Sequence, residues 1–384
     1  MKRLAIFCDG TWNRMAADEP TNVLLAAQAV LSTGAKKVPQ VVHYNEGVGT
    51  SFVVNEWVET RLAGAFGWSL FDKVADAYRF LIFNYEPGDE IFIFGFSRGA
   101  FTARSLGGLL RKCGIIPRAS GRDIKKAFDF YQLKAVAPDD DQAQQFRMTY
   151  SPQTLAKDED RAWRVAHGAD PAQVAATPLL DIRYIGVWDT VEALGLPKHL
   201  HLSNLTGRIG AYEFHDARLS STVHSARHAV ATDEMRRSFE PTLWDNLPLL
   251  NGATGKLYEQ MWFPGNHGSV GGGGSIRGLS DNALLWILEG AQKQGLAFDP
   301  ALITLAQGRI DNAAPLSNVT KEAGPLDWIY RKAPRPAPAP GDVLAPATIA
   351  RMQTDDAYRP EPLKAWWPGQ PITIGNRRRS GPLP

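Results

Sequence analysis

The sequence predicts an α/β fold: a mostly parallel sheet with helices on both faces, interrupted by inserted cap segments. Two observations carry this prediction. Short apolar runs typical of buried strands alternate along the chain with longer stretches of helical periodicity. Glycine-rich or polar motifs directly follow several of these runs, where ligands bind in sheets of this kind. At 384 residues, the chain can bury a large core.

The alternation begins at the N-terminus. Residues 3–8 are an apolar run that predicts a buried strand. Thr21 or Asn22 is suited to cap the helix that follows, because both side chains can accept a backbone N–H. A second strand is expected at 38–44 and a long amphipathic helix at about 70–84.

A nucleophile elbow is the central feature of the sequence. The apolar run 91–94 leads into Gly-x-Ser-x-Gly, with the serine at Ser97, and a helical pattern starts at 101. Strand, tight turn and helix form the context that exposes a nucleophilic serine. Side chains at Gly95 and Gly99 would collide with the neighbouring strand and helix, which explains both glycines.

Two polar insertions interrupt the second half of the chain. Residues 117–180 carry scattered aromatic side chains and predict a helical cap, while 195–220 predict a loop-rich insertion. Strands are expected at 182–187, 226–231 and 257–263, followed by a closing helix from 280. We expect one domain over 1–330 and a Pro-rich C-terminal extension, 331–384, packed on the domain or partly disordered.

The composition excludes several classes of function. The net charge of +2 gives no strong field toward nucleic acid. Two cysteines, both in expected core elements, indicate neither a disulfide framework nor a metal site. The N-terminal apolar run is too short for a signal peptide. We therefore expect synthesis in the cytoplasm, with any export following a route without a signal peptide.

Three residues fit a Ser-acid-His triad in the chain order of α/β-hydrolases. A serine needs a base, and the base needs an orienting acid. Asp189 directly follows a predicted strand, and His267 follows the last strand within a glycine-rich stretch. The commoner place for the acid is one strand later, where Asp233 and Glu234 stand. Asp189 is favoured because it ends an unbroken apolar strand, as Ser97 does.

The oxyanion hole is predicted from two backbone donors. One is the N–H of Arg98, the residue after the nucleophile. The other is the Thr11 N–H, which Gly10 allows to turn inward after the first strand. Asp9 is expected to support this loop by accepting its N–H groups, since a carboxylate is only an acceptor.

Two rival chemistries share these stretches. Asp9-Gly10-Thr11 resembles the end of the phosphatase motif Asp-x-Asp-Gly-Thr, but the nucleophilic position is Phe7. The run 271–274 is all glycine and could suggest a phosphate loop, but no Lys-Ser/Thr follows it. We interpret this run as a flexible loop.

Several stretches together resemble one family of α/β-hydrolases, the family that includes the first class of type VI secretion lipase effectors. The resemblance spans roughly residues 3–290 and is far more specific than any single motif. The matching stretches are Phe7-Cys8-Asp9-Gly10-Thr11-Trp12-Asn13, Gly47-Val48-Gly49-Thr50, Gly95-Phe96-Ser97-Arg98-Gly99-Ala100, Gly186-Val187-Trp188-Asp189-Thr190-Val191, Arg227-His228-Ala229 with Asp233-Glu234, and Trp262-Phe263-Pro264-Gly265 through His267 to Gly273.

The resemblance implies a Ser97, Asp189 and His267 triad and hydrolysis of esters, with phospholipid acyl esters as the substrate of characterised secreted members. The chain departs from the family twice. Ser269 stands where the family usually has an aspartate, two residues after the histidine. Because the stretch after residue 300 is short and Pro-rich, we expect it to hold no counterpart of the large membrane-anchoring region of the lipase effectors.

Three functional hypotheses follow. The first is a serine esterase acting on lipid acyl esters, with both insertions forming an apolar lid. The second is an esterase for small soluble or polymeric esters, and the third is a non-catalytic binding module. We expect no cofactor. The expected partners are a lipid or small ester substrate, a membrane surface contacted transiently, and an immunity or secretion partner, with no nucleic acid.

Overall fold

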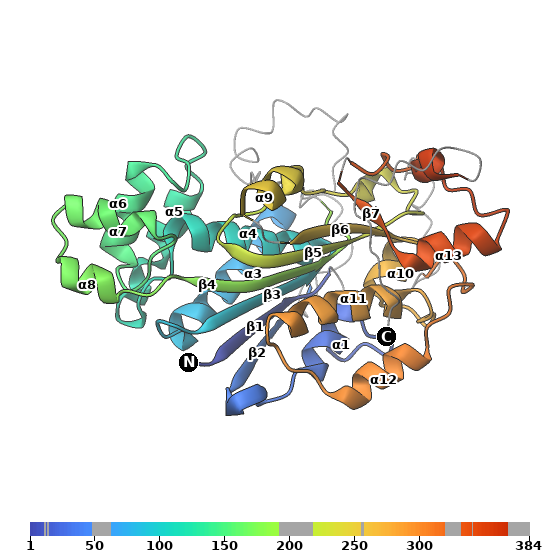
Figure 1. The fold of residues 1–384 in the computed structure, drawn as a ribbon, viewed down its shortest axis with the longest axis horizontal. Helices are drawn as coiled ribbons and strands as arrows, with labels where there is room; N and C mark the ends of the chain where they lie inside the picture. The colour runs from blue at the N-terminus through green and yellow to red at the C-terminus, as the bar shows by residue number, and fades with distance from the viewer. Residues whose placement is uncertain are drawn as a thin grey trace.

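The computed structural model of the chain describes residues 1–10, 13, 15–47, 63–191, 218–254, 257–318, 332–339 and 341–367. Its centre is a sheet of seven parallel strands in the order β2-β1-β3-β4-β5-β6-β7 (Figure 1). The strands are β1 (Arg3–Cys8), β2 (Gln40–Asn45), β3 (Glu90–Phe96), β4 (Asp181–Trp188), β5 (Val223–Ala231), β6 (Tyr258–Phe263) and β7 (Val343–Leu344). The predicted α/β class, with its mostly parallel sheet, is confirmed.

Strand side chains alternate between two cores, one on each face of the sheet. In β1, Leu4 and Ile6 pack with α3 (Ala63–Asn84), α4 (Arg98–Cys113) and α9 (Leu247–Thr254). Ala5 and Phe7 pack on the other face with α1 (Asn22–Ala29), α11 (Ser280–Lys293) and α12 (Pro300–Gly308). Figure 1 shows these two helical layers on either side of the sheet.

Thr21 resolves the choice of cap for the first helix. Its hydroxyl accepts the Leu24 N–H at 3.2 Å and donates to Asp9 Oδ2 at 2.6 Å. The cap of α1 is therefore bonded to the loop that follows β1. Asn22, the alternative, instead donates to Val270 O and Ser280 O, which holds α1 against α10 (His267–Gly271) and the start of α11.

The first insertion is helical, as predicted, but it lies at the wrong end of the sheet to be a lid. It contains η2 (Arg118–Asp123), α5 (Ile124–Tyr131), α6 (Asp141–Tyr150), α7 (Glu159–Ala166) and α8 (Pro171–Ala176). Because α4 returns from the carboxyl to the amino end of the strands, a segment between α4 and β4 must lie at the amino end (Figure 1). The expectation that residues 117–180 cover Ser97 is therefore wrong. The second insertion lies almost wholly outside the described residues.

The described part of the C-terminal extension is more regular than its Pro-rich composition suggested. β7 pairs with β6, which places Val343 opposite Met261 and Leu344 opposite Trp262. Asp342 accepts hydrogen bonds from the side chains of Gln260 and Trp262. Helix α13 (Pro346–Thr354) and η6 (Glu361–Trp366) follow. Proline costs α13 nothing at its first position, where the N–H has no helical acceptor.

Three short helices complete the description: η1 (Ala35–Lys37), η4 (Arg237–Phe239) and α10 (His267–Gly271). In the described part of the chain, no helix combines the length and the apolar character that a bilayer crossing requires.

Candidate active site

Ser97 occupies the sharp turn between β3 and α4. Its backbone has φ 58° and ψ −125°, in a region that residues other than glycine rarely adopt. Such a conformation costs roughly 1–3 kcal/mol and persists only where the surroundings enforce it. The Ser97 N–H donates to Trp188 O at 3.0 Å, and the residue is 4% exposed. The end of β4 therefore helps to hold the strained turn that a nucleophile elbow requires.

The glycines around Ser97 are explained by close backbone contacts. A Cβ at Gly95 would lie 2.3 Å from Gly99 O, and a Cβ at Gly99 would lie 2.1 Å from Cys8 O. Gly10 packs against the serine, since a Cβ there would meet Ser97 Cβ at 3.2 Å. The loop after β1 therefore lies beside the elbow, where an oxyanion donor was predicted.

The oxyanion residues themselves stay predictions. Arg98 opens α4, so its backbone N–H lies at the positive end of the helix dipole. Gly10 is in place beside Ser97. Thr11, whose N–H was expected to be the second donor, lies outside the described residues.

Asp189 and His267 meet at the carboxyl end of the sheet. Asp189 follows β4, and His267 is the first residue of α10. His267 Nδ1 lies 2.5 Å from Asp189 Oδ2, and both side chains are buried. Because a carboxylate only accepts, Nδ1 carries the shared proton and Nε2 is left as the basic nitrogen. Burial lowers the pKa of His267, while its hydrogen bond to Asp189 and the negative charge of that carboxylate oppose the shift.

Aromatic side chains enclose the His267 ring. The Phe96 ring lies 4.5 Å away, and the edge-on Phe239 ring lies 4.8 Å away. Since Phe96 directly precedes Ser97, the imidazole lies beside the elbow. Gly271 permits this packing, because a Cβ there would come within 1.9 Å of the Phe96 ring.

Arg335 completes the surroundings of Asp189, and sequence reasoning missed it. Its guanidinium donates to both carboxylate oxygens, with Nη1 2.5 Å from Oδ1 and Nη2 2.8 Å from Oδ2. Burial acts to raise the pKa of Asp189, but the charge of Arg335 and the hydrogen bonds from His267 and Arg335 outweigh it and hold that pKa well below its usual range. No sequence signal pointed here, since Arg335 is one arginine in a Pro/Ala-rich run.

The alternative acids bind the backbone near His267 rather than its ring. Asp233 Oδ2 accepts the Gly265 N–H at 2.6 Å and the Tyr358 hydroxyl at 2.9 Å. Glu234 pairs with Arg236 and accepts the His267 N–H at 3.3 Å. Both carboxylates brace the loop that carries the histidine. The structure therefore brings Ser97, Asp189 and His267 to one place and leaves Asp233 and Glu234 in supporting positions.

Comparison with known proteins gives the family. A sequence profile described as "T6SS, Phospholipase effector Tle1-like, catalytic domain" matches residues 2–290. The chain belongs to this family. Arg335 lies beyond the matched residues of the Tle1-like catalytic domain, whereas Ser97, Asp189 and His267 lie within them.

Three relatives are similar in part. An uncharacterized protein from Saccharomyces cerevisiae, YEL023C, is 26% identical over 259 residues, which cover 65% of this chain and 33% of that protein. An uncharacterized protein from Pseudomonas aeruginosa has a crystal structure with a TM-score of 0.44 and 17% identity, matching 81% of this chain and 49% of that one. The structure of the Tle1 effector bound to the VgrG spike of the type VI secretion system has a TM-score of 0.36 and 17% sequence identity. The match covers 71% of this chain and 51% of that one. The chain thus spans about a third to a half of the length of these relatives.

Ser269, the departure from the family pattern, ties the histidine loop to the chain that follows. Its N–H and hydroxyl both donate to Asn266 Oδ1 at 3.0 Å. The hydroxyl also lies 2.8 Å from Leu316 O. In this Tle1-like domain, the serine at this position therefore forms hydrogen bonds both within its own loop and to Leu316.

The structure supports neither a phosphatase site at the end of β1 nor a flexible phosphate loop at 271–274. Phe7 is a core residue stacked on Phe94 at 4.6 Å, so position 7 faces the interior. The glycine run is packed rather than a flexible loop. Gly272 and Gly273 have φ of 78° and 88°, and a Cβ at Gly274 would overlap the Asn318 side chain at 2.0 Å.

Among the described residues, no group of three or more His, Cys, Asp or Glu side chains could hold a metal ion.

Asp9 links three elements beneath the elbow. Its carboxylate accepts the Gly10 N–H, the Thr21 hydroxyl and the Tyr44 hydroxyl, each at 2.6 Å. It therefore braces its own loop, as predicted, and also bonds to the cap of α1 and to β2. Burial raises the pKa of Asp9 to about 6, against the effect of these hydrogen bonds.

Asp9→Asn is expected to change how stability depends on pH. Because the folded-state pKa of Asp9 is raised, its contribution is fully present below about pH 4 and is lost as pH rises through about 6. The free energy of unfolding of the wild type, relative to Asp9→Asn, should therefore fall by about 2 kcal/mol between pH 4 and pH 7. Urea unfolding at each pH measures this. Parallel curves for the two proteins would contradict it.

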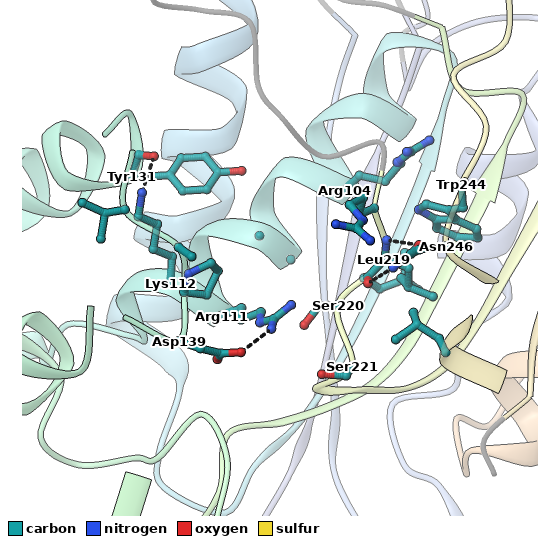
Figure 2. Close-up of a pocket in the computed structure, with 18 of the residues that line it drawn as sticks. Arg104, Arg111, Lys112, Tyr131, Asp139, Leu219, Ser220, Ser221, Trp244 and Asn246 are labelled. Carbon is teal, nitrogen blue, oxygen red and sulfur yellow. Dashed lines mark hydrogen bonds and ion pairs between the residues drawn. The ribbon is translucent and has the colours of Figure 1, made fainter. Parts of the chain in front are cut away.

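A cavity of about 460 Å³ lies away from the triad, between α4, the helical cap and residues 218–250 (Figure 2). In its wall, Arg111 pairs with Asp139 at 3.1 Å, and Lys112 donates to Tyr131 O and Leu133 O. Among the described residues that line it, none belongs to the triad.

Proposed function

We propose that the chain is a serine hydrolase that cleaves carboxylic esters, most naturally phospholipid or other lipid acyl esters, through Ser97, His267 and Asp189. The observation that carries the proposal is the buried Asp189–His267 hydrogen bond beside a strained serine elbow. Membership of a phospholipase effector family supports the lipid substrate.

The chemistry follows from the roles that the geometry allows. Ser97 Oγ attacks the ester carbonyl carbon while its proton passes to His267 Nε2. Asp189 holds the imidazole tautomer and stabilises the imidazolium that forms. The N–H groups of Arg98 and Thr11 are proposed to bind the oxyanion. His267 then returns the proton to the leaving alkoxide, which gives the alcohol and an acyl-Ser97 ester.

Deacylation repeats these steps with water. His267 Nε2 removes a proton from a water molecule, which attacks the acyl carbonyl. Collapse of the second tetrahedral intermediate releases the fatty acid and returns the proton to Ser97. The residues of this chain thus supply every proton transfer in the proposed cycle.

Substrate class is tested by acyl chain length. A lipid hydrolase should show kcat/KM rising from acetyl to long-chain acyl esters, and should release fatty acid from phosphatidylcholine or phosphatidylethanolamine vesicles. Ser97→Ala protein is the matched blank. A preference for acetyl or butyryl esters without vesicle hydrolysis would favour the small-ester alternative. Absence of all hydrolysis and of fluorophosphonate labelling would favour the binding module.

Membership of the family supports a proposal about partners and location. We propose that the chain is exported from the producing cell and that it has a secretion or immunity partner. In one solved structure, a Tle1 effector is bound to the VgrG spike, a pairing that belongs to that protein.

A further inference from the structure

We propose that Arg335, supplied by the C-terminal segment beyond the family-matched region, is a positioning residue for the triad. Through its bidentate contact it fixes the orientation of Asp189 and, through Asp189, the basicity of His267. This inference rests on the proposed function and makes residues 332–339 part of the working enzyme.

The contacts leave the Asp189 carboxylate no freedom to rotate. Oδ1 accepts the Ala231 N–H at 2.9 Å and Arg335 Nη1 at 2.5 Å. Oδ2 accepts His267 Nδ1 at 2.5 Å and Arg335 Nη2 at 2.8 Å. The planar guanidinium fork matches a carboxylate in a way that an ammonium group cannot. Asp189 is wholly buried and the Arg335 side chain is 3% exposed, so water does not compete for these bonds.

Arg335 also holds the neighbours of the triad. Nη1 donates to Ala231 O at 2.8 Å, at the end of β5, and Nη2 donates to Phe239 O at 2.7 Å. The Phe239 ring packs against His267. The segment is anchored in turn, because the Ala333 N–H donates to Met235 O at 2.8 Å. The Arg335 side chain therefore holds three groups in place: the Asp189 carboxylate, the end of β5, and the backbone of Phe239, whose ring packs on His267.

The charge of Arg335 is expected to act on the base through Asp189. His267 faces Asp189 and Glu234, which raise its pKa, and Arg236, which lowers it. Arg335 shares the Asp189 carboxylate with His267, and its charge also reaches Asp233 and His228. Removing Arg335 leaves protonated His267 as the remaining cation on Asp189. The imidazolium should then be more stable and the pKa of His267 higher.

The test compares Arg335→Met and Arg335→Lys with the wild type. Arg335→Met should lower kcat per titrated active site roughly hundredfold, as expected for misplacement of a catalytic pair. The acidic limb of its kcat/KM profile should move up by about 1–2 pH units. Arg335→Lys keeps the positive charge but loses the bidentate guanidinium contact. We therefore expect kcat to fall while the acidic limb of the kcat/KM–pH profile stays near its wild-type pH.

Arg351→Met is the matched control. Arg351 also lies in the C-terminal extension and donates to backbone carbonyls, those of Asn312 and Ala314, but it does not contact Asp189 or His267. Arg351→Met should change neither the maximum of the kcat/KM–pH profile nor the pH of its acidic limb. If Arg335→Met does not fold, Arg335→Lys alone decides. Folded variants with a wild-type profile, or with only fewer titratable sites, would overturn the inference.

A readout without turnover separates this inference from the proposed function. In Ser97→Ala protein, the pKa of His267 is followed by NMR of ¹⁵N-histidine-labelled chain and assigned with a His267→Asn variant. Addition of Arg335→Met should raise that pKa by about 1–2 units. An unchanged pKa would overturn the role of Arg335 even in an active esterase. A raised pKa in a protein without esterase activity would remove only the proposed function.

Discussion

Ser97→Ala is expected to abolish ester hydrolysis while leaving the fold intact. Removal of a triad nucleophile costs on the order of a millionfold in turnover, because the acyl-enzyme can no longer form. The fold should persist because the elbow is held by backbone contacts, including the Ser97 N–H bond to Trp188 O. Turnover of a phospholipid or short-chain ester, measured beside a thermal unfolding curve, checks both parts.

Two further substitutions sharpen this result. Ser97→Gly should be as inactive and at least as stable, since glycine adopts the φ of 58° without strain. Ser105→Ala is the matched serine control, because Ser105 is buried in the same helix, α4, and its hydroxyl has no hydrogen-bond partner in the described structure. It should keep wild-type turnover. More than a few per cent of activity in Ser97→Ala would show that the elbow is not the active site.

Asp189→Asn is expected to lower kcat roughly ten-thousandfold, because the amide loses the charge that stabilises imidazolium and the acceptor that fixes its tautomer. The structure adds a cost in stability. The new amide would leave Arg335 buried without a carboxylate, and breaking a buried pair costs about 3–5 kcal/mol. Rates must therefore be measured per titrated active site in protein shown to be folded.

Asp233→Asn is the paired comparison for that result. Asp233 Oδ2 accepts both the Gly265 N–H and the Tyr358 hydroxyl, and the amide oxygen of an asparagine can accept the same two bonds. Its effect on kcat should be far smaller than that of Asp189→Asn. If Asp233→Asn proved the more damaging change, the acid would belong one strand along and Asp189 would be structural.

The parts of the site that sequence could predict are those that follow directly from a strand. Ser97, Asp189 and His267 each come just after an apolar run, and parallel strands bring such positions to one edge of the sheet. Gly95 and Gly99 were predictable from the steric demands of the elbow, and the overlaps at 2.3 and 2.1 Å are the physical reason for them.

The parts that sequence could not predict depend on contacts between distant segments. Arg335 meets Asp189 across a separation of 146 residues, from a Pro-rich segment with no periodic pattern. β7 has two residues, too few to read as a strand. The misplaced lid had a different cause. Helical character in 117–180 was recognisable, but its position follows from α4 returning to the amino end of the sheet.

The central claim is that Ser97 is the activated nucleophile of an Asp-His-Ser triad. The most direct measurement is reaction with a fluorophosphonate probe, followed by mass-spectrometric mapping of the labelled peptide. The account predicts one adduct, on Ser97, absent in Ser97→Ala and formed far more slowly in His267→Ala and Asp189→Asn, with Ser105→Ala labelled at the wild-type rate. An adduct on another serine, with phospholipid hydrolysis intact in Ser97→Ala, would contradict it.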